Sequence, residues 1–228
     1  MKKMLILLLF YSLCACDDVL IEENKRIEIK GSMVSPENEP VSGIEIFSVG
    51  SRDGWIGPDT DKILGKGRSD ENGEFNFISL DTDSHGLVLA INPSEIDQNS
   101  SYASLYFYDS TGDHAGLYDF DKVTVAQRLE FQFSISNTSG VQDTLLYTLR
   151  YKQPVLNYIY ENEIFVEQEP PGNFISLRQH TPDSDPAVHR LSVLGATEIV
   201  FSYGLGESEV QQILIPVGTE DNSYDFEY

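Results

Sequence analysis

The sequence predicts an all-β protein made of two antiparallel β-sandwich domains. Apolar and polar residues alternate in short runs, for example at Ile27 and Ile29 and again at Phe75 and Phe77. A period of two is typical of strands that bury one face, and clusters of turn-forming residues separate the runs. No stretch has the period of an amphipathic helix, so regular turns between many short strands favour sandwiches. Besides strands around residues 27–29, 44–46 and 75–77, we expect strands at 86–92, 102–108, 122–125, 129–135, 145–151, 174–177, 189–194, 198–203 and 210–215.

Composition limits the size and the partners of the protein. The chain has 228 residues, of which 40% are hydrophobic, and 37 acidic against 15 basic side chains give a net charge of −22. This composition is globular, and the length suits one large domain or two of roughly 100 residues each. So acidic a protein repels phosphates, which excludes nucleic acid as a partner and argues against a polybasic hold on anionic lipid.

The N-terminus has the layout of an export signal. Lys2 and Lys3 precede an apolar run over residues 5–13, which is shorter than the roughly 20 residues that a membrane-spanning helix needs. Residues 13–16 are Leu-Cys-Ala-Cys, and this tetrapeptide resembles the lipobox of bacterial lipoproteins, in which the cysteine, here Cys16, becomes the acylated first residue. The alternative is an ordinary cleaved signal, although an Ala-x-Ala cleavage site is missing.

The lipobox resemblance implies a signal peptide over residues 1–15, lipidation at Cys16 and an acidic tether over residues 16–25. Acyl chains such as palmitate would hold the protein on a membrane without spanning it. Asp17 and Asp18 resemble the acidic export signal of some Gram-negative lineages, whereas other lineages use an Asp here for retention in the inner membrane. We therefore expect an outer-membrane lipoprotein exposed at the cell surface, with a periplasm-facing orientation as the alternative.

We place the domain boundary after residue 127. This gives a first sandwich over residues 26–127 and a second over residues 128–228, each of ordinary domain size. Either the strand at 122–125 or the one at 129–135 closes the first sandwich. The sequence shows no internal repeat and no linker rich in Pro or Gly.

The first domain contains a specific pattern. Gly31 stands inside the first strand, Pro40 precedes the second, and Asn72 and Gly73 form a turn before Phe75. This pattern resembles the carboxypeptidase regulatory-like domain, a transthyretin-like sandwich of exported bacterial proteins. That resemblance implies a module with a role in folding, packing or binding and without catalytic activity. Glycine in a strand allows a close approach of a neighbour, and Asn-Gly suits the positive φ of a tight hairpin. The second domain resembles no known family.

No group of residues indicates catalysis, a metal or a cofactor. The four histidines lack the spacing of a zinc site. The run from Asp81 to Gly86 has the alternating oxygens of a calcium loop but reaches Asn92 where a bidentate Glu is needed. There is no Gly-x-Ser-x-Gly motif, and Cys16 is acylated in the lipoprotein interpretation. We therefore expect no enzyme, with an envelope hydrolase of unidentified site as a remaining alternative.

Aromatic residues suggest a ligand site. Trp55 lies in a segment rich in turn formers, where an exposed ring could stack on a sugar or anchor a protein. Tyr102, Tyr106 and Tyr108 alternate along one expected strand and so share a face. Carbohydrate binding by Trp55, Tyr102 and Tyr106 is therefore one hypothesis. The alternative is that Trp55 covers the end of the sandwich and that the tyrosines are ordinary half-buried strand residues.

Two short motifs resemble bacterial O-glycosylation sites, Asp-Ser-Thr at Ser110 and Asp-Thr-Leu at Thr144. The function we expect is that of a non-catalytic envelope lipoprotein, an accessory or binding module. Its partners would be the membrane, through Cys16, and an envelope protein or glycan.

Overall fold

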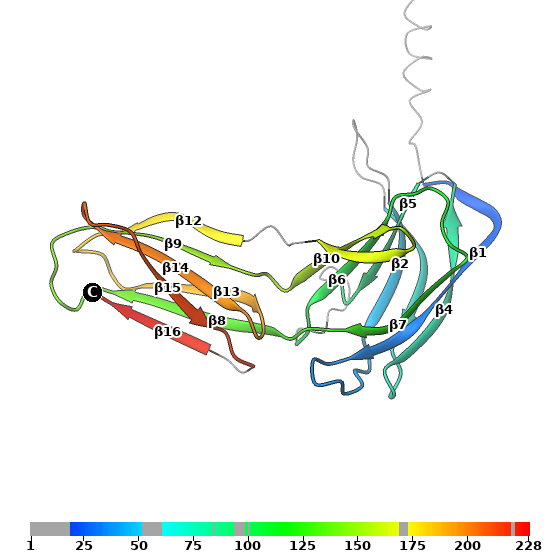
Figure 1. Ribbon diagram of the computed structural model, residues 1–228, viewed down its shortest axis with the longest axis horizontal. Coiled ribbons are helices and arrows are strands. Elements are labelled where there is room, and N and C mark those ends of the chain that lie inside the picture. Colours follow the sequence, from blue (N-terminus) through cyan, green and yellow to red (C-terminus); the bar gives the residue numbers. More distant parts are fainter. Residues whose placement is uncertain are drawn as a thin grey trace, which may run out of the picture.

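The computed structural model describes residues 19–51, 61–83, 85–93, 99, 101–168, 173–219 and 222–228. All the regular elements in these segments are strands, and they build two β-sandwiches that follow one another along the longest axis (Figure 1). The all-β, two-sandwich prediction is confirmed. No helix in the described ranges is long and apolar enough to cross a membrane.

The first sandwich has a small and a large sheet. The small sheet has the order β4-β1-β7, and the large sheet begins β3-β2-β5-β6. β7 closes this sandwich, which decides between the two closing strands that the sequence left open. The strands are β1 (Ile21–Val34), β2 (Glu45–Ser51), β3 (Lys62–Arg68), β4 (Glu74–Thr82), β5 (Gly86–Ile91), β6 (Ser104–Asp109) and β7 (Leu117–Thr124).

The second sandwich also has two sheets, ordered β13-β8-β16 and β12-β9-β14-β15. β16 is parallel to β8 and carries the end of the chain. The strands are β8 (Arg128–Ser136), β9 (Leu145–Tyr151), β12 (Asn173–His180), β13 (Ala187–Leu194), β14 (Glu198–Leu205), β15 (Gln211–Pro216) and β16 (Asn222–Glu227).

The two sandwiches share one topology. In each, the first strand lies between the fourth strand, which is antiparallel to it, and the last strand, which is parallel to it. In each, the facing sheet places the second strand between the third and the fifth, with the sixth beyond the fifth. The structure therefore contains an internal duplication that the sequence did not show, because many side-chain combinations satisfy the same strand alternation.

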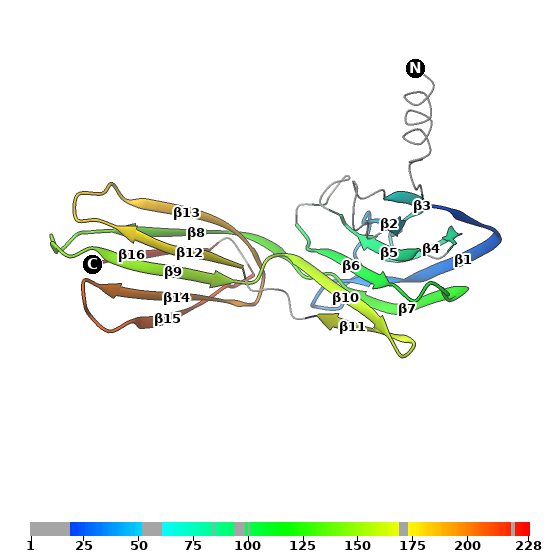
Figure 2. The same ribbon diagram turned by 90° about the horizontal axis from the view of Figure 1, so that it is seen from above.

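A hairpin of the second half extends the first sandwich. β10 (Val155–Glu161) and β11 (Ile164–Gln168) follow β9, but β10 pairs in parallel with β6, so that Tyr158 lies opposite Phe107. The large sheet thus becomes β11-β10-β6-β5-β2-β3. Figure 2 shows the hairpin reaching from the second sandwich to the first. The assignment of residues 128–228 to the second sandwich is therefore wrong for this hairpin, which satisfies the backbone edge of β6 and buries aromatic rings against the first core.

Two details of the N-terminal part bear on earlier expectations. β1 begins at Ile21, inside the expected tether of residues 16–25, because this stretch pairs with β4 and Val19 is buried. A Cβ on Gly31 would lie 2.9 Å from Phe75 and 3.0 Å from Phe120, so the expected close approach at this glycine is confirmed. Cys16 lies outside the described residues.

Candidate binding groove

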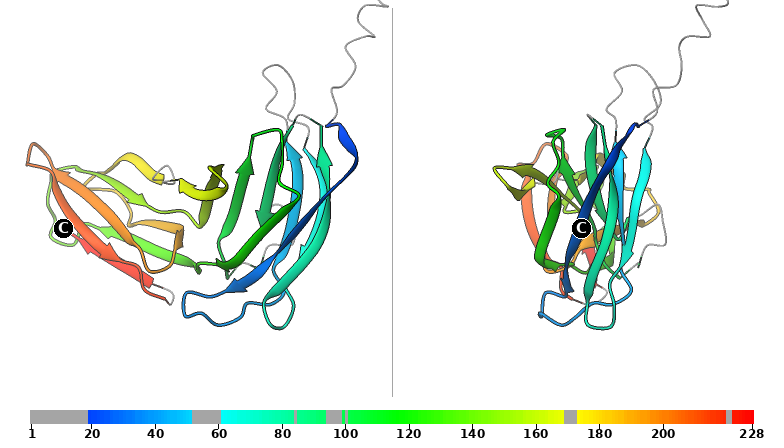
Figure 3. Two further views of the ribbon diagram at one scale, coloured as in Figure 1. Left: turned by 45° about the vertical axis from the view of Figure 1, so that its right-hand side comes forward. Right: turned by 90° about the vertical axis from the view of Figure 1, so that its right-hand side faces the viewer.

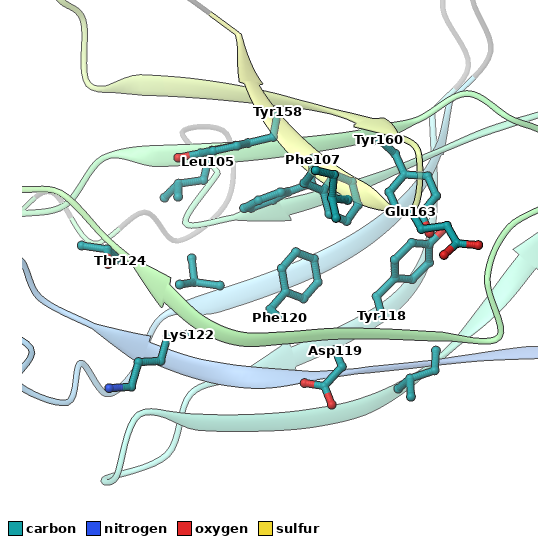
Figure 4. Close-up of a pocket in the computed structure, with 14 residues that line it drawn as sticks. Leu105, Phe107, Tyr118, Asp119, Phe120, Lys122, Thr124, Tyr158, Tyr160 and Glu163 are labelled. Atoms are coloured by element: carbon teal, nitrogen blue, oxygen red, sulfur yellow. The ribbon is translucent and has the colours of Figure 1, made fainter.

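A cavity of about 460 Å³ lies between β7 and the β10–β11 hairpin (Figure 4). β7 is the last strand of the small sheet, and no described strand pairs with its outer edge. β10 and β11 continue the large sheet past β6, and their rings of Tyr160 and Phe165 contact Tyr118 and Phe120 of β7. In Figure 4, Tyr118 and Phe120 face the cavity from β7, while Tyr158 and Tyr160 face it from β10. We call this cavity and its rim the β7 groove.

Aromatic packing fixes the walls of the β7 groove. Phe107 stacks on Tyr158 with ring centroids 4.5 Å apart, and Phe120 stacks on Phe165 at 5.4 Å. Phe107 and Phe120 meet edge to face at 4.9 Å and so join the two sides. Each such pair contributes about 0.5–1.5 kcal/mol beyond the burial of its area. The groove is therefore a preformed feature of the first sandwich.

Two phenols of the groove, those of Tyr118 and Tyr158, have a raised pKa. Tyr118 donates a hydrogen bond of 2.5 Å to the buried carboxylate of Asp109. Burial, followed by this contact with Asp109, raises the pKa of Tyr118 far above its usual value of 10.0. Burial, with a smaller contribution from Glu167, raises the pKa of Tyr158 to about 12. Both side chains therefore offer apolar rings and neutral hydroxyls.

The rim of the groove is acidic. Lys122 lies there and donates to Asn38 at 2.9 Å, and Asp119 forms an ion pair of 3.0 Å with Lys30 of β1. β10 and β11 contain no Lys or Arg. The carboxylates on β7 and the hairpin are Asp119, Asp121, Glu161, Glu163 and Glu167.

The predicted ligand residues do not lie in this groove. Tyr106 and Tyr108 point from β6 to the outer face of the large sheet, where their rings lie 6.4 Å apart and border an open hollow of about 810 Å³. Tyr102 precedes β6, bridges to Gln127 and packs against the first core, so the structure does not bring it to this face. Trp55 lies outside the described residues.

The predicted glycosylation residues lie in loops. Ser110 is exposed after β6, next to Asp109, whose carboxylate also accepts a hydrogen bond from Thr111. Thr144 is half-buried before β9. Nothing in this geometry tests modification at either residue.

Two histidines form separate pairs with tyrosines of the second sandwich. His180 lies 2.7 Å from the hydroxyl of Tyr228, and His189 lies 2.7 Å from that of Tyr147. Over the ranges that the structure describes, no group of three or more His, Cys, Asp or Glu residues could hold a metal ion.

Asp81 is a buried carboxylate with a basic side chain beside each oxygen. It is completely buried, with His114 Nδ1 2.6 Å from one oxygen and Lys25 Nζ 2.9 Å from the other. Burial raises the pKa of Asp81, but the hydrogen bonds with Lys25 and His114 outweigh it and hold the pKa below its usual value of 3.8. Asp81 thus joins β1, β4 and the loop before β7 at one end of the sandwich.

Asp81 makes the first sandwich sensitive to acid. A carboxylate whose pKa is lowered by folding stabilises the fold above its unfolded pKa, and this contribution is lost as the pH falls through the folded pKa. The variant Asp81→Asn is expected to be less stable at pH 7 and to lose less of its remaining stability between pH 5 and pH 3. Urea unfolding across this range measures both effects. The control Asp225→Asn, at an exposed position of β16, should follow the unaltered protein; an equally steep acid loss in Asp81→Asn would contradict the assignment.

Fold and groove together define a tandem β-sandwich protein with a preformed aromatic groove.

No family model and no curated protein matches the chain. Among solved structures, similarity is found to the Bacillus anthracis TIE protein, with 13% identity, a TM-score of 0.33 and coverage of 90% of this chain and 34% of that one. A streptococcal ancillary pilin gives 11% identity, a TM-score of 0.30 and coverage of 90% and 63%. The shaft pilin SpaA of Lactobacillus rhamnosus GG gives 9% identity, a TM-score of 0.28 and coverage of 89% and 97%. The chain thus spans about a third of the TIE protein and less than two thirds of the ancillary pilin.

The residues of the groove were not predicted as a site. Two short apolar and aromatic runs, residues 158–160 and 164–166, flank a polar turn at Asn162 and Glu163, both of which have positive φ. Two such runs joined by a short turn are a hairpin signal, which the sequence analysis did not use. No local signal indicates that the hairpin docks on β6.

Proposed function

We propose that the protein is a non-catalytic binding protein of the cell envelope, anchored by a lipid on Cys16. The β7 groove is the observation that carries the proposal, because an apolar cavity with a few polar groups at its rim is the usual form of a binding site. The raised pKa values of Tyr118 and Tyr158 suit recognition instead of proton transfer. The resemblance of the first domain to carboxypeptidase regulatory-like modules supports the same role.

The β10–β11 hairpin, which both sandwiches share, would hold the groove in a fixed orientation relative to the second sandwich. Both ends of the β10–β11 segment are joined to strands of the second sandwich, while its rings pack in the first. The β6–β10 pairing thus connects the two sandwiches a second time, in addition to the direct chain connection from β7 to β8. We propose that the pair acts as one stiff module at the membrane surface.

The anchor is tested with cells of the native host. Cys16→Ser is expected to abolish incorporation of an alkyne-labelled fatty acid and to release the protein from the membrane fraction, because the acylated sulfur is lost. Cys14→Ser is the matched control and should retain label and membrane association, since this residue is removed with the signal. Label on Cys16→Ser, or equal loss in both variants, would overturn the anchor, and protease added to intact cells reports surface exposure.

Binding through the groove is tested by photo-crosslinking in the same cells. A photoreactive residue at Thr124, which lines the groove, is expected to give a discrete adduct. The same residue at Thr138, an exposed loop position of the second sandwich, is the control and should not. The same adducts from both positions, or none from Thr124, would argue against a binding role for the groove.

Carbohydrate binding is a second candidate, favoured by the neighbouring rings of Tyr106 and Tyr108 over the outer hollow. Neighbouring tyrosine faces can stack on sugar rings. Oligosaccharide titration followed through the single tryptophan, Trp55, should give saturable quenching that Tyr108→Ala removes. Quenching that survives in Tyr108→Ala would exclude this face as the sugar site.

A further inference from the structure

The β7 groove runs along the free edge of a strand. It is lined by inward side chains of β7, such as Tyr118 and Val123, and also by residues at the rim, such as Asp119 and Thr124. A cavity that touches both faces of one strand follows the backbone of that strand. The outer N–H and C=O groups of β7, for which no described strand is a partner, therefore border the cavity.

Within the described residues, the large sheet of the first sandwich has six strands, whereas the small sheet has three. β10 and β11 extend the large sheet past β6, and Figure 3 shows the hairpin beside the margin of the first sandwich. Rings of the hairpin face β7, since Tyr160 contacts Tyr118 and Phe165 contacts Phe120. One further strand, about 4.8 Å from β7, would lie next to this hairpin, whose aromatic side chains are still only half-buried.

Charge identifies the kind of strand that fits. β7 and the hairpin carry five carboxylates, of which Asp119 and Glu163 line the groove. The cations beside them are Lys122 and Lys30, the latter paired with Asp119, so that negative charge remains in excess around the groove. Aromatic faces such as those of Tyr158 and Tyr160 also attract cations. A segment with Lys or Arg side chains therefore complements the groove, whereas an acidic segment is repelled.

We propose that the β7 groove binds an extended, basic peptide segment of a partner protein, which adds to the small sheet as a fourth strand beside β7. Main-chain hydrogen bonds to β7 supply affinity, and a Lys or Arg placed among the rings supplies selectivity. This inference rests on the proposed binding function and names its partner class.

The edge of β7 also explains why not every strand binds. Asp121 has a φ of 46°, and the pairing of β7 with β1 shifts between Lys30 and Ser32. Such a bulge interrupts the edge and protects it from indiscriminate pairing. Side-chain contacts in the groove have to complete the recognition.

The test uses the full lipoprotein in nanodiscs and fluorescently labelled peptides. The probe is a short peptide that alternates Val and Thr around a central Arg. One comparison peptide has Glu in place of Arg, and a second has Pro at two positions and so lacks the amides that pair with a strand edge. Fluorescence anisotropy is expected to show binding of the Arg peptide alone, and hydrogen exchange over residues 117–124 should slow when it binds.

Variants separate the groove from the general negative charge of the protein. Glu163→Gln combined with Glu167→Gln is expected to weaken binding about five- to tenfold. Glu207→Gln combined with Glu209→Gln, both exposed on the second sandwich, is the matched control and should bind as the unaltered protein does. Equal weakening in both, or unchanged binding of the Pro peptide, would show attraction by charge alone and overturn the proposal.

Two further outcomes also count against it. A dimer in analytical ultracentrifugation that Thr124→Arg dissociates would make a second copy the occupant of the groove. A discrete cellular adduct at Thr124 together with no binding of the Arg peptide would leave the binding function in place and refute this partner class.

Discussion

Replacing Phe201 by Ala is expected to lower the free energy of unfolding of the second sandwich by about 3–5 kcal/mol. Phe201 is fully buried on β14, and its ring centroid lies 4.8 Å from those of Phe133 and Phe226 and 5.0 Å from that of Tyr203. These partners come from both sheets, so that the substitution leaves a cavity at the centre of the core. Such a site relaxes little, because strands fixed on both sides cannot collapse into it.

Urea unfolding followed by circular dichroism measures this loss. Val188→Ala, on β13, is the control because Val188 is 54% exposed, and its stability should change by less than about 0.5 kcal/mol. Hydrogen exchange should accelerate in β8, β9 and β14 of Phe201→Ala, while β1 and β4 keep their protection. A loss of under about 1 kcal/mol would mean that Phe201 does not organise the core.

Gly73→Ala is expected to destabilise the first sandwich by about 3 kcal/mol. Gly73 has a φ of +77°, and a Cβ there would collide with the carbonyl oxygen of Met33. The N–H of Met33 also donates a hydrogen bond of 2.8 Å to the carbonyl oxygen of Gly73, which ties the hairpin end to β1. Asp70 holds the same turn by accepting bonds of 2.9 Å from Asn72 N and Glu74 N. The backbone therefore cannot move away without breaking the turn.

Gly112→Ala separates the two causes. Gly112 has a similar φ of +73°, but nothing lies within 4 Å of the position of its Cβ. This variant should lose only the cost of the left-handed conformation, about 1–2 kcal/mol. Thermal and urea unfolding of both variants should show the larger loss at Gly73, and equal losses would contradict the steric argument.

Strand positions followed from residue alternation wherever an element was amphipathic. The expected strands at 86–92 and 145–151 agree with β5 and β9 to within one residue. β3, β10, β11 and β16 were missed. β3 contains two glycines in a short basic run, and β16 lies among acidic residues at the end of the chain, so neither shows a strong period of two.

The candidate site was predicted less well than the fold. Tyr106 and Tyr108 were expected to share a face, and they do so on the outer surface of the large sheet. The β7 groove was not expected, because its walls come from β6, β7 and a hairpin that belongs by sequence to the second half. Each wall looks like an ordinary strand when read alone.

The amino-acid order settled the structural class and the strands, since alternation and turn residues act over a few neighbouring positions. Which edge each strand joins was decided only by the three-dimensional arrangement. Backbone hydrogen bonds are nearly the same for every sequence and therefore do not select the edge that a strand joins. The hairpin pairs with β6 because Tyr158 and Phe165 are buried against Phe107 and Phe120, which are far from them in the chain.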